Sequence, residues 1–331
     1  MKEFVLGKND AGQRLDRWLA KTVPLLPAPL AQKYIRLKRV KVNGKGSRRD
    51  VRLCRGDVLQ LYINDEFFDT PTPENAFLSL YQPKLNILYE DDQILLLDKR
   101  PGMVVHPDES ERVNTLLTHL QAYLYQKKEW SPYWENSFAP ALCNRIDRNT
   151  GGIVIAAKTA EALRVMNQKI KDREIEKYYL CVARGELRPP AGRLEGFLLK
   201  DEGKKQVSVY KKPVPGAKTA VTLYKTLAAR EGLSLVECEL VTGRTHQIRA
   251  QMAAAGHPLL GDGKYGRERE DRKYGRHGQA LYSYKLTFSF TTGAGPLAHL
   301  NGRTFQVEDV DFVEEYFPGY TWREGSVESG A

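Results

Sequence analysis

The sequence contains no long run of apolar residues. Its opening segment, MKEFVLGKND, lacks the apolar core of a signal peptide, and no later run approaches the ~20 apolar residues that span a bilayer. Internal repeats are also missing, as is a glycine-rich strand-to-helix loop of the kind that holds a nucleotide cofactor. These absences argue against a membrane protein and against a methyltransferase, and they predict a cytoplasmic location.

Cysteine is scarce as well. The four cysteines, Cys54, Cys143, Cys181 and Cys238, are widely spaced in the sequence. They form no Cys-x-x-Cys pair and no cluster with histidine at zinc-ligand spacing. We expect them to be reduced thiols that mostly pack in the interior. Three histidines, His106, His246 and His257, lack a neighbouring set of acidic ligands, so the sequence predicts no metal site.

Positive charge is present in excess, and it is concentrated in one part of the chain. The 331 residues carry a formal net charge of +10. Residues 1–63 contain fifteen Lys or Arg and five Asp or Glu, whereas the remaining residues contain 36 of each kind. A solvated charged face is one interpretation of such a run. We favour binding to nucleic acid, because basic side chains that neutralise phosphates release condensed counterions.

Residues 1–63 have the pattern of a small α/β module. Apolar residues at helical spacing predict helices over 14–23 and 30–38, and short strands are expected before the Asn43-Gly44 turn and in VLQLYI. The segments RLDRWL, KVNGK and GDVLQL, in this order, resemble the S-four-like RNA-binding module. That resemblance implies contacts with RNA backbone from the second helix and the turn after it. The candidate RNA-binding residues are Lys33, Arg36, Lys38, Arg39 and Lys41.

The rest of the chain divides into a linker and a large domain. Residues 64–85 combine acids and prolines with little periodicity, which is typical of a linker. In residues 86–331 strands outnumber helices, and most connections are too short for helical crossovers. We therefore predict an α+β fold with a mainly antiparallel mixed sheet. One helix should be capped by Thr159, and another should run from about 244 to 255.

One short segment carries the candidate chemistry. In NRIDRNTGG, residues 144–152, Asp147 stands between two arginines before a strand that reads as buried. Alone, this fragment would be interpreted as a surface ion pair. It is accompanied by YEDDQILLLDKRPGMVVHP, EKYYLCVARG, TGRTHQIRAQM and GHPLLGDGKYG. Over residues 86–290 these five segments resemble, in the same order, the RluA-type pseudouridine synthases, whose catalytic motif is written HRLDxxTSG.

The resemblance implies isomerisation of uridine to pseudouridine in structured RNA, with a flipped base and no cofactor. Asp147 would be the nucleophile, attacking the sugar C1′ or the uracil ring or assisting formation of a glycal, and the sequence does not choose among these routes. Tyr179 would stack on the uracil and help to remove the C5 proton, whereas strand alternation turns Tyr178 to the other face. Arg244 would pair with Asp147 and keep it ionised, with phosphate binding as the alternative.

Substrate recognition is less well defined. Arg145 would enter the RNA stack where the uridine has left, the alternative being a structural salt bridge. Asn144 replaces the usual His, Asn149 and Gly151 replace Asp and Ser, and Arg100 stands in place of a proline. These departures put substrate selection in doubt, with ribosomal RNA favoured and transfer RNA the alternative. We expect a monomer without an obligate protein partner. The rival function is a non-catalytic RNA-binding or ribosome-assembly factor of the same fold.

Overall fold

The structure is a computed structural model that describes residues 1–320 apart from 8, 9, 70, 71, 73, 74, 134, 136, 137, 202, 204, 205 and 267. Its internal contacts form two units. One unit contains Met1–Leu85 and His106–Ala139, and the other contains Asn86–Val105 and Pro140–Ala331. One boundary between the units falls between Leu85 and Asn86, and residues 106–139 group with the N-terminal unit. The assignment of an S-four-like module to residues 1–63 stays a prediction. No helix in the described ranges is long and apolar enough to cross a membrane.

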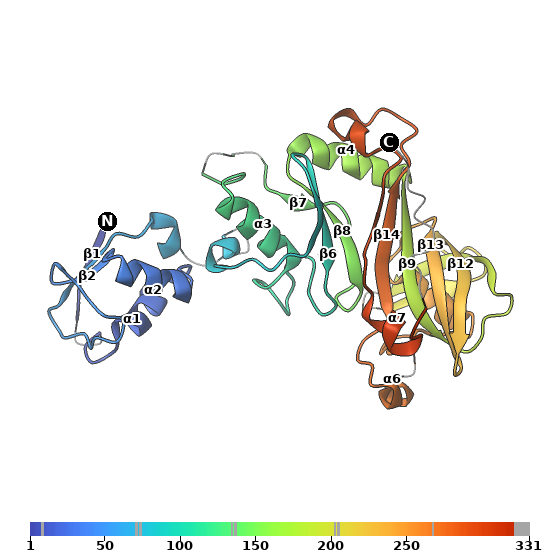
Figure 1. The fold of residues 1–331 in the computed structure, drawn as a ribbon, viewed down its shortest axis with the longest axis horizontal. Helices are drawn as coiled ribbons and strands as arrows, with labels where there is room; N and C mark the ends of the chain where they lie inside the picture. The colour runs from blue at the N-terminus through green and yellow to red at the C-terminus, as the bar shows by residue number, and fades with distance from the viewer. Residues whose placement is uncertain are drawn as a thin grey trace. The chain divides into compact units, whose positions relative to one another are not determined.

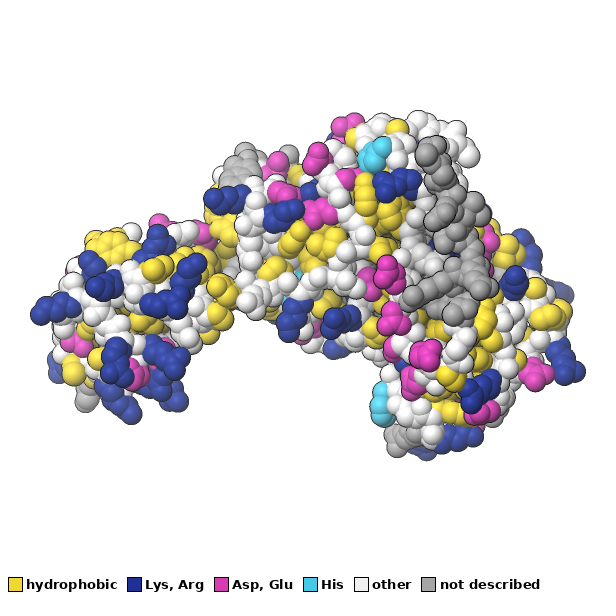
Figure 2. Space-filling view, in the orientation of Figure 1, with side chains coloured by type: hydrophobic (Ala, Val, Ile, Leu, Met, Phe, Trp, Pro, Cys, Tyr) yellow, Lys and Arg dark blue, Asp and Glu magenta, His cyan; other side chains and the backbone are white. Residues whose placement is uncertain are grey.

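The N-terminal unit begins with a small sheet and two helices. The four strands pair antiparallel in the order β1 (Lys2–Val5), β4 (Val58–Leu61), β2 (Val40–Val42) and β3 (Lys45–Gly46). The predicted helices are confirmed as α1 (Leu15–Thr22) and α2 (Ala28–Arg36). The predicted turn between β2 and β3 is confirmed too, since Asn43 and Gly44 both have positive φ, 52° and 77°. Figure 2 shows many Lys and Arg side chains on the surface of this part of the chain.

Residues 64–85, which we interpreted as a linker, contain two short 3-10 helices, Asp65–Phe68 and Ala76–Ser79. Phe77 is buried, and its ring lies edge-on to Tyr125 of α3 (Leu116–Gln126) and to Trp130, with centroids 5.1 and 5.2 Å apart. The order of this segment therefore comes from aromatic packing with a distant helix, which has no signature in local periodicity. Residues 70, 71, 73 and 74 of the expected linker lie outside the described residues.

The second unit contains an eleven-stranded sheet (Figure 1). Its main path follows the order β11 (Gln206–Tyr210), β10 (Ala191–Asp201), β12 (Lys218–Arg230), β13 (Leu233–Leu240), β9 (Ile175–Arg184), β14 (Leu281–Phe288), β8 (Gly151–Ala157), β6 (Ile94–Lys99) and β5 (Ile87–Glu90). Two short strands join it, β15 (Thr304–Gln306) beside β14 and β7 (Ala141–Leu142) beside β8. Within the described residues only β8 and β14 pair in parallel, so the predicted α+β fold with a mainly antiparallel mixed sheet is confirmed.

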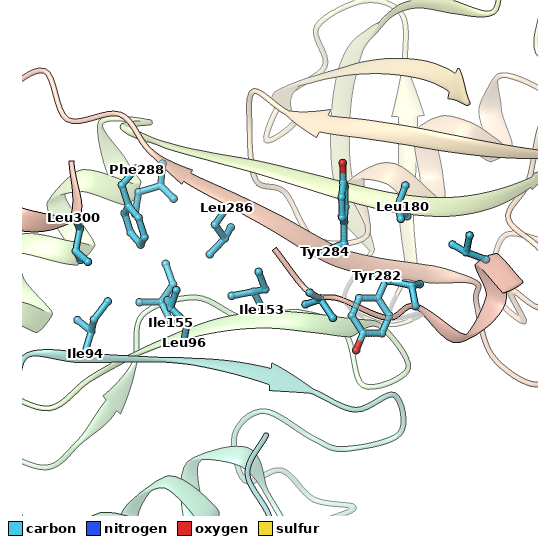
Figure 3. Close-up of a cluster of buried hydrophobic side chains, with 14 of the residues drawn as sticks. Ile94, Leu96, Ile153, Ile155, Leu180, Tyr282, Tyr284, Leu286, Phe288 and Leu300 are labelled. Carbon is cyan, nitrogen blue, oxygen red and sulfur yellow. The ribbon is translucent and has the colours of Figure 1, made fainter. Parts of the chain in front are cut away.

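The main core lies around β8, which is buried along its whole length. Its alternate residues Ile153 and Ile155 lie near Leu96 of β6 and Leu286 of β14, and Figure 3 shows these side chains in one cluster. Burial of an aliphatic side chain of this size contributes about 1.5–3 kcal/mol. The candidate nucleophile lies in the loop before β8, and this loop therefore ends on a strand that is held in the core.

Helices flank the sheet at a few points. Thr159 caps α4 (Ala160–Lys171), as predicted, by accepting a hydrogen bond from the backbone N–H of Ala162. Helix α5 (Gln247–Ala254) contacts β10, β11 and β12. Shorter helices are α6 (Glu268–Asp271) and α7 (Asp311–Tyr316), with 3-10 helices at Arg272–Tyr274 and Gly295–Leu300.

The predicted start of α5 near residue 244 was wrong. His246 has a left-handed backbone with φ 53°, and the Gln247 side chain accepts the backbone N–H of Arg244, so residues 244–246 form a turn. The helix begins after this turn. Its N-terminal end faces the cavity that contains the candidate site.

Candidate active site

A cavity of about 510 Å³ lies in the second unit, at the point where three distant parts of the chain meet. It is lined by the loop 143–150, by the end of α4 and the start of β9, and by residues 240–249. Asp147 lies in the loop between β7 and β8, where the backbone N–H of Thr150 donates to the Asp147 carbonyl over 3.0 Å. This turn directs the Asp147 side chain, which is 27% exposed, into a half-enclosed site.

Two polar side chains hold the loop in place. The Asn144 amide oxygen accepts the backbone N–H of Ile155 over 2.7 Å, which joins the loop to β8. The buried Lys99 ammonium donates to the carbonyl groups of Arg100, Met103 and Arg148. Burial lowers the pKa of Lys99 to about 8, while the nearby Asp147 carboxylate acts in the opposite direction. Asn144, one of the departures from the family motif, therefore has a structural role in this chain.

The two glycines at the end of the motif permit a close approach of β14. A Cβ added at Gly151 would lie 2.3 Å from the Tyr282 ring, and one at Gly152 would lie 2.2 Å from the carbonyl oxygen of Ser283. Gly152 also has φ 111°, a conformation that L side chains rarely adopt. The Tyr282 ring occupies the space that a serine at position 151 would need, so Gly151 and Tyr282 fit one another.

The guanidinium that contacts Asp147 belongs to Arg249. Its Nη1 donates to Asp147 Oδ2 over 2.7 Å, from a side chain that is 6% exposed on the first turn of α5. The predicted pairing of Arg244 with Asp147 is therefore wrong in this structure. The Arg244 Nε donates to the carbonyl of Thr219, because its position in the turn before α5 points it along β12. Arg244 still lines the cavity, where its alternative role in phosphate binding is open.

A second carboxylate, that of Asp262, holds the other edge of the Arg249 guanidinium. Its Nε and Nη2 donate to the two oxygens of Asp262 over 2.7 and 2.8 Å, and Asp262 is fully buried. Burial opposes ionisation, but the hydrogen bonds and charge of Arg249 hold the pKa of Asp262 below its usual range. Burial likewise opposes the charge of Arg249, but the Asp262 carboxylate raises the pKa of Arg249 above its usual value. The planar guanidinium thus joins both carboxylates in one rigid group.

Tyr179 lies in the cavity, on β9, and is 7% exposed. Burial raises the pKa of Tyr179 to about 12, and the Asp147 carboxylate contributes in the same direction. At neutral pH the hydroxyl is therefore protonated. Tyr178 is not among the residues that line the cavity, and its hydroxyl donates to Glu176 over 2.8 Å. The two tyrosines thus have the opposite orientations that strand alternation predicts.

Cationic side chains dominate the cavity wall. Asp147 is the single carboxylate among the lining residues, which lie in the described part of the chain, and the cations are Arg145, Lys171, Arg173, Lys177, Arg244 and Arg249. Arg145 is exposed and stands two residues before Asp147 in the loop. The formal neutrality of residues 64–331 therefore conceals a locally positive site.

The other five predicted RNA-binding residues, apart from Arg145, lie in the N-terminal unit. Lys33 and Arg36 on α2 line a second cavity of about 620 Å³ together with Arg48 and Arg49. Lys38 is exposed at the end of α2. Two others pack over aromatic rings, with the Arg39 guanidinium 5.1 Å from the Tyr34 ring centroid and the Lys41 ammonium 5.2 Å from that of Tyr62.

The surroundings of His246 and His257 differ. Across the residues that the structure describes, no group of three or more His, Cys, Asp or Glu side chains is arranged to hold a metal ion. His246 lies in the cavity, whereas the His257 Nδ1 contacts the carbonyl of Arg184. Cys143 lines the cavity, and burial raises the pKa of its thiol to about 12, so it is inert as a nucleophile near neutral pH.

Sequence reasoning missed three residues of the site: Lys99, Arg249 and Asp262. The sequence did contain a signal for Arg249, because it is the one charged residue in the helical segment QIRAQMAA. A charged side chain that is buried with such a helix needs a partner of opposite charge. Asp262 gave no such signal, because its pairing depends on how the loop after Leu260 folds back on α5.

Comparisons with known proteins place these features in a family context. The sequence model described as RNA pseudouridylate synthase matches residues 93–254. An uncharacterized RNA pseudouridine synthase of Mycoplasma genitalium is 32% identical, over 86% of this chain and 88% of the relative. Ribosomal large subunit pseudouridine synthase D of Neisseria meningitidis is 32% identical, over 84% of this chain and 72% of the relative.

Two further likenesses agree with these. Ribosomal large subunit pseudouridine synthase C of Vibrio vulnificus is 30% identical, over 86% of this chain and 87% of the relative. Among solved structures, human RNA Pseudouridylate Synthase Domain Containing 4 aligns with a TM-score of 0.53 at 19% identity, over 70% of this chain and 91% of that chain. At this identity the structural likeness supports the fold alone.

Proposed function

The chain belongs to the RNA pseudouridine synthase family, and on that premise we propose that it isomerises uridine in large-subunit ribosomal RNA with Asp147 as the nucleophile. The observation that carries this proposal is the pairing of Asp147 with Arg249 inside a cationic cavity that also contains Tyr179. Two of the relatives are named for the large ribosomal subunit, which favours ribosomal over transfer RNA.

The reaction breaks the bond between uracil N1 and C1′, makes a bond between C5 and C1′, removes the proton from C5 and adds a proton to N1. It is redox-neutral, so it needs a nucleophile and a held base but no electron carrier, and we propose that no cofactor takes part. Asp147 Oδ2 is engaged by Arg249, whereas Oδ1 has no hydrogen-bond partner in the described part of the chain. An ionised carboxylate with one open oxygen suits attack at C1′, attack on the uracil ring or assistance of glycal formation.

Arg249 supplies the electrostatic condition for this role. A half-buried carboxylate loses part of its hydration, and the Arg249 guanidinium, 2.7 Å away, replaces it with a charge-assisted hydrogen bond. Because Asp262 neutralises the second half of the guanidinium, Arg249 is held in place before RNA binds.

Tyr179 is proposed to stack on the flipped uracil. Its buried ring forms a wall of the cavity, and its protonated hydroxyl is a donor. With a pKa of about 12, the hydroxyl assists removal of the C5 proton only by accepting that proton while it passes its own to another group.

RNA is proposed to bind through both cationic surfaces. Lys33 and Arg36 would contact the backbone from the N-terminal module, together with Lys38, Arg39 and Lys41. Arg145 at the cavity edge is suited to fill the stack after the base has flipped, since a planar guanidinium stacks and pairs with phosphate. We propose that the protein acts as a monomer, and ribosomal RNA as the substrate favours the cytoplasm.

The test is a turnover assay on defined RNA. Purified protein is incubated with protein-free large-subunit ribosomal RNA and, separately, with transfer RNA transcripts, in buffer containing EDTA. Pseudouridine is then mapped by carbodiimide labelling and primer extension. We expect modification at discrete positions of the ribosomal RNA and none in transfer RNA. Modification of transfer RNA alone would overturn the substrate assignment, and binding without modification of either RNA would favour the non-catalytic factor.

A further inference from the structure

A second side chain faces the same oxygen of Asp147 as Arg249 does. His246 Nε2 lies 3.7 Å from Asp147 Oδ2, and the His246 side chain is 12% exposed. Its backbone is left-handed, with φ 53°. Residues other than glycine adopt this conformation infrequently, and it persists only where the surrounding structure holds the residue in place.

Tyr265 contacts the nitrogen of the His246 ring that faces away from Asp147. The backbone N–H of Val207 donates to the Tyr265 hydroxyl oxygen over 2.7 Å, and the same hydroxyl lies 2.8 Å from His246 Nδ1. The Asp147 carboxylate only accepts hydrogen bonds and lies on the Nε2 side of the ring, so the arrangement that suits both neighbours has the Tyr265 hydroxyl donating to Nδ1. Burial lowers the pKa of His246, which keeps the ring neutral. A neutral ring that accepts at Nδ1 carries its single proton on Nε2, the atom that faces Asp147.

We propose that His246, oriented by Tyr265, is a positioning residue that acts with Arg249 as a second donor on Asp147 Oδ2 and leaves Oδ1 as the reacting oxygen. This inference rests on the proposed role of Asp147. The distance of 3.7 Å exceeds that of a hydrogen bond, and contacts of this kind commonly tighten once the substrate is bound. Two donors on one oxygen fix the rotation of the carboxylate, and the lone pairs of the other oxygen then face the substrate.

The segment 261–266 holds both donors. Asp262 Oδ1 accepts the backbone N–H groups of Lys264 and Tyr265 while the same carboxylate binds Arg249. The Tyr265 ring centroid lies 5.3 Å from the Arg249 guanidinium. The charged and titratable groups around His246 are therefore Asp147 from the loop, Arg249 from α5, and Asp262, Lys264 and Tyr265 from this segment. Replacement of Tyr265 by Phe removes the hydroxyl but keeps the ring beside Arg249.

The experiment uses a matched pair of His246 variants in the full-length protein. The amide nitrogen of Gln occupies nearly the position of imidazole Nε2, whereas Asn reproduces the Nδ1 side. His246→Gln thus retains a donor toward Asp147, and His246→Asn loses it. We expect His246→Asn to lower kcat by roughly 10- to 100-fold, the size of one hydrogen bond to a charged group, with KM within about twofold of wild type. His246→Gln should recover most of that loss.

Tyr265 is tested through His246. Tyr265→Phe should lower kcat, and the double variant Tyr265→Phe/His246→Asn should be no slower than His246→Asn alone, because the hydroxyl acts only through the ring. Tyr178→Phe is the matched control, since it also removes the hydroxyl of a part-buried tyrosine, in this case from β9 and away from the cavity.

The outcomes separate this inference from the proposed function. If wild-type protein forms no pseudouridine, the proposed function fails and the inference with it. If wild type turns over and His246→Asn matches it in kcat, the inference alone is overturned. Equal losses in the Asn and Gln variants would also overturn it, because they would show that the donor at the Nε2 position is not what matters. Circular dichroism and urea unfolding of each variant identify any loss that comes from misfolding.

Discussion

Replacement of Arg249 by Lys tests the electrostatic centre of the site. Arg249 makes one charge-assisted hydrogen bond to Asp147 and two to the buried Asp262. A lysine keeps the positive charge but lacks the planar fork, so its ammonium stays with the fully buried Asp262 and releases Asp147. Removing the charge altogether, as in Arg249→Met, would leave the buried Asp262 without its ion-pair partner and lower the free energy of unfolding by about 3–5 kcal/mol. A loss of activity in that variant could then come from misfolding.

The expected magnitude follows from the lost contact. A hydrogen bond to a charged group contributes about 1.5–3 kcal/mol, and each ~1.4 kcal/mol is a factor of ten in rate. We therefore expect Arg249→Lys to lower kcat by roughly 10- to 150-fold with a small change in KM. The bond that Asp262 also loses should lower the free energy of unfolding by a similar amount, measurable by urea denaturation.

Arg244→Lys is the matched control. Arg244 lines the same cavity but donates to a backbone carbonyl, so its replacement should act mainly on KM. Single-turnover rates at saturating RNA, together with KM from a substrate titration, separate the two effects. Wild-type kcat in Arg249→Lys, combined with a large loss of kcat in Arg244→Lys, would refute Arg249 as the partner of Asp147. It would favour the pairing of Arg244 with Asp147 that the sequence resemblance implied.

Three further predictions concern the rest of the molecule. Tyr179→Phe should bind RNA as wild type does but lose isomerisation if the hydroxyl takes part in proton transfer, whereas Tyr178→Phe should turn over normally; the reverse pattern would show that the strand faces the other way. The full-length double variant Lys33→Gln/Arg36→Gln should reduce the salt dependence of RNA binding by about 0.7–0.9 in the log-log slope for each lost contact. The control Arg188→Gln removes one positive charge, at an exposed ion pair with Glu186, and should leave that slope unchanged. Equal slopes for wild type and both variants would show that Lys33 and Arg36 do not contact the RNA. Finally, the hydrogen bond from Lys169 lowers the pKa of Glu174 from 4.5 to about 2. A carboxyl group whose pKa is lower in the folded state stabilises the fold fully above about pH 4.5. That stabilisation is lost as the pH falls toward 2. Glu174→Gln should therefore unfold at lower urea than wild type at pH 7, with the difference shrinking below about pH 4.5; a constant difference would contradict the pairing.

The sequence predicted the parts of the fold that depend on local pattern. Periodicity located α1 and α2, the Asn43-Gly44 dipeptide located a hairpin turn, and Thr159 located the start of α4. These features depend on residues within one or two turns of each other. The 3-10 helices in 64–85 were missed, since their order depends on contacts between Phe77 and aromatic rings about fifty residues away.

The same distinction applies to the site. Strand alternation was enough to separate Tyr179 from Tyr178. It did not separate Arg244 from Arg249, because that choice depends on where α5 begins. The left-handed residue His246 delays the helix to Gln247 and so places Arg249, not Arg244, opposite Asp147. The buried pairing of Arg249 with Asp262 links two segments through tertiary packing, which no local pattern encodes.

The most direct test of the account is proton release from C5 by Asp147→Asn. Ribosomal RNA transcribed with uridine tritiated at C5 loses its label to water whenever a C5–C1′ bond replaces the C5–H bond. Wild-type protein is expected to release tritium, whereas Asp147→Asn, which keeps the shape of the side chain but not its nucleophilicity, should release none while it binds the RNA with similar Kd. Tritium release by Asp147→Asn at a rate near that of wild type would contradict the central claim that this carboxylate carries the chemistry.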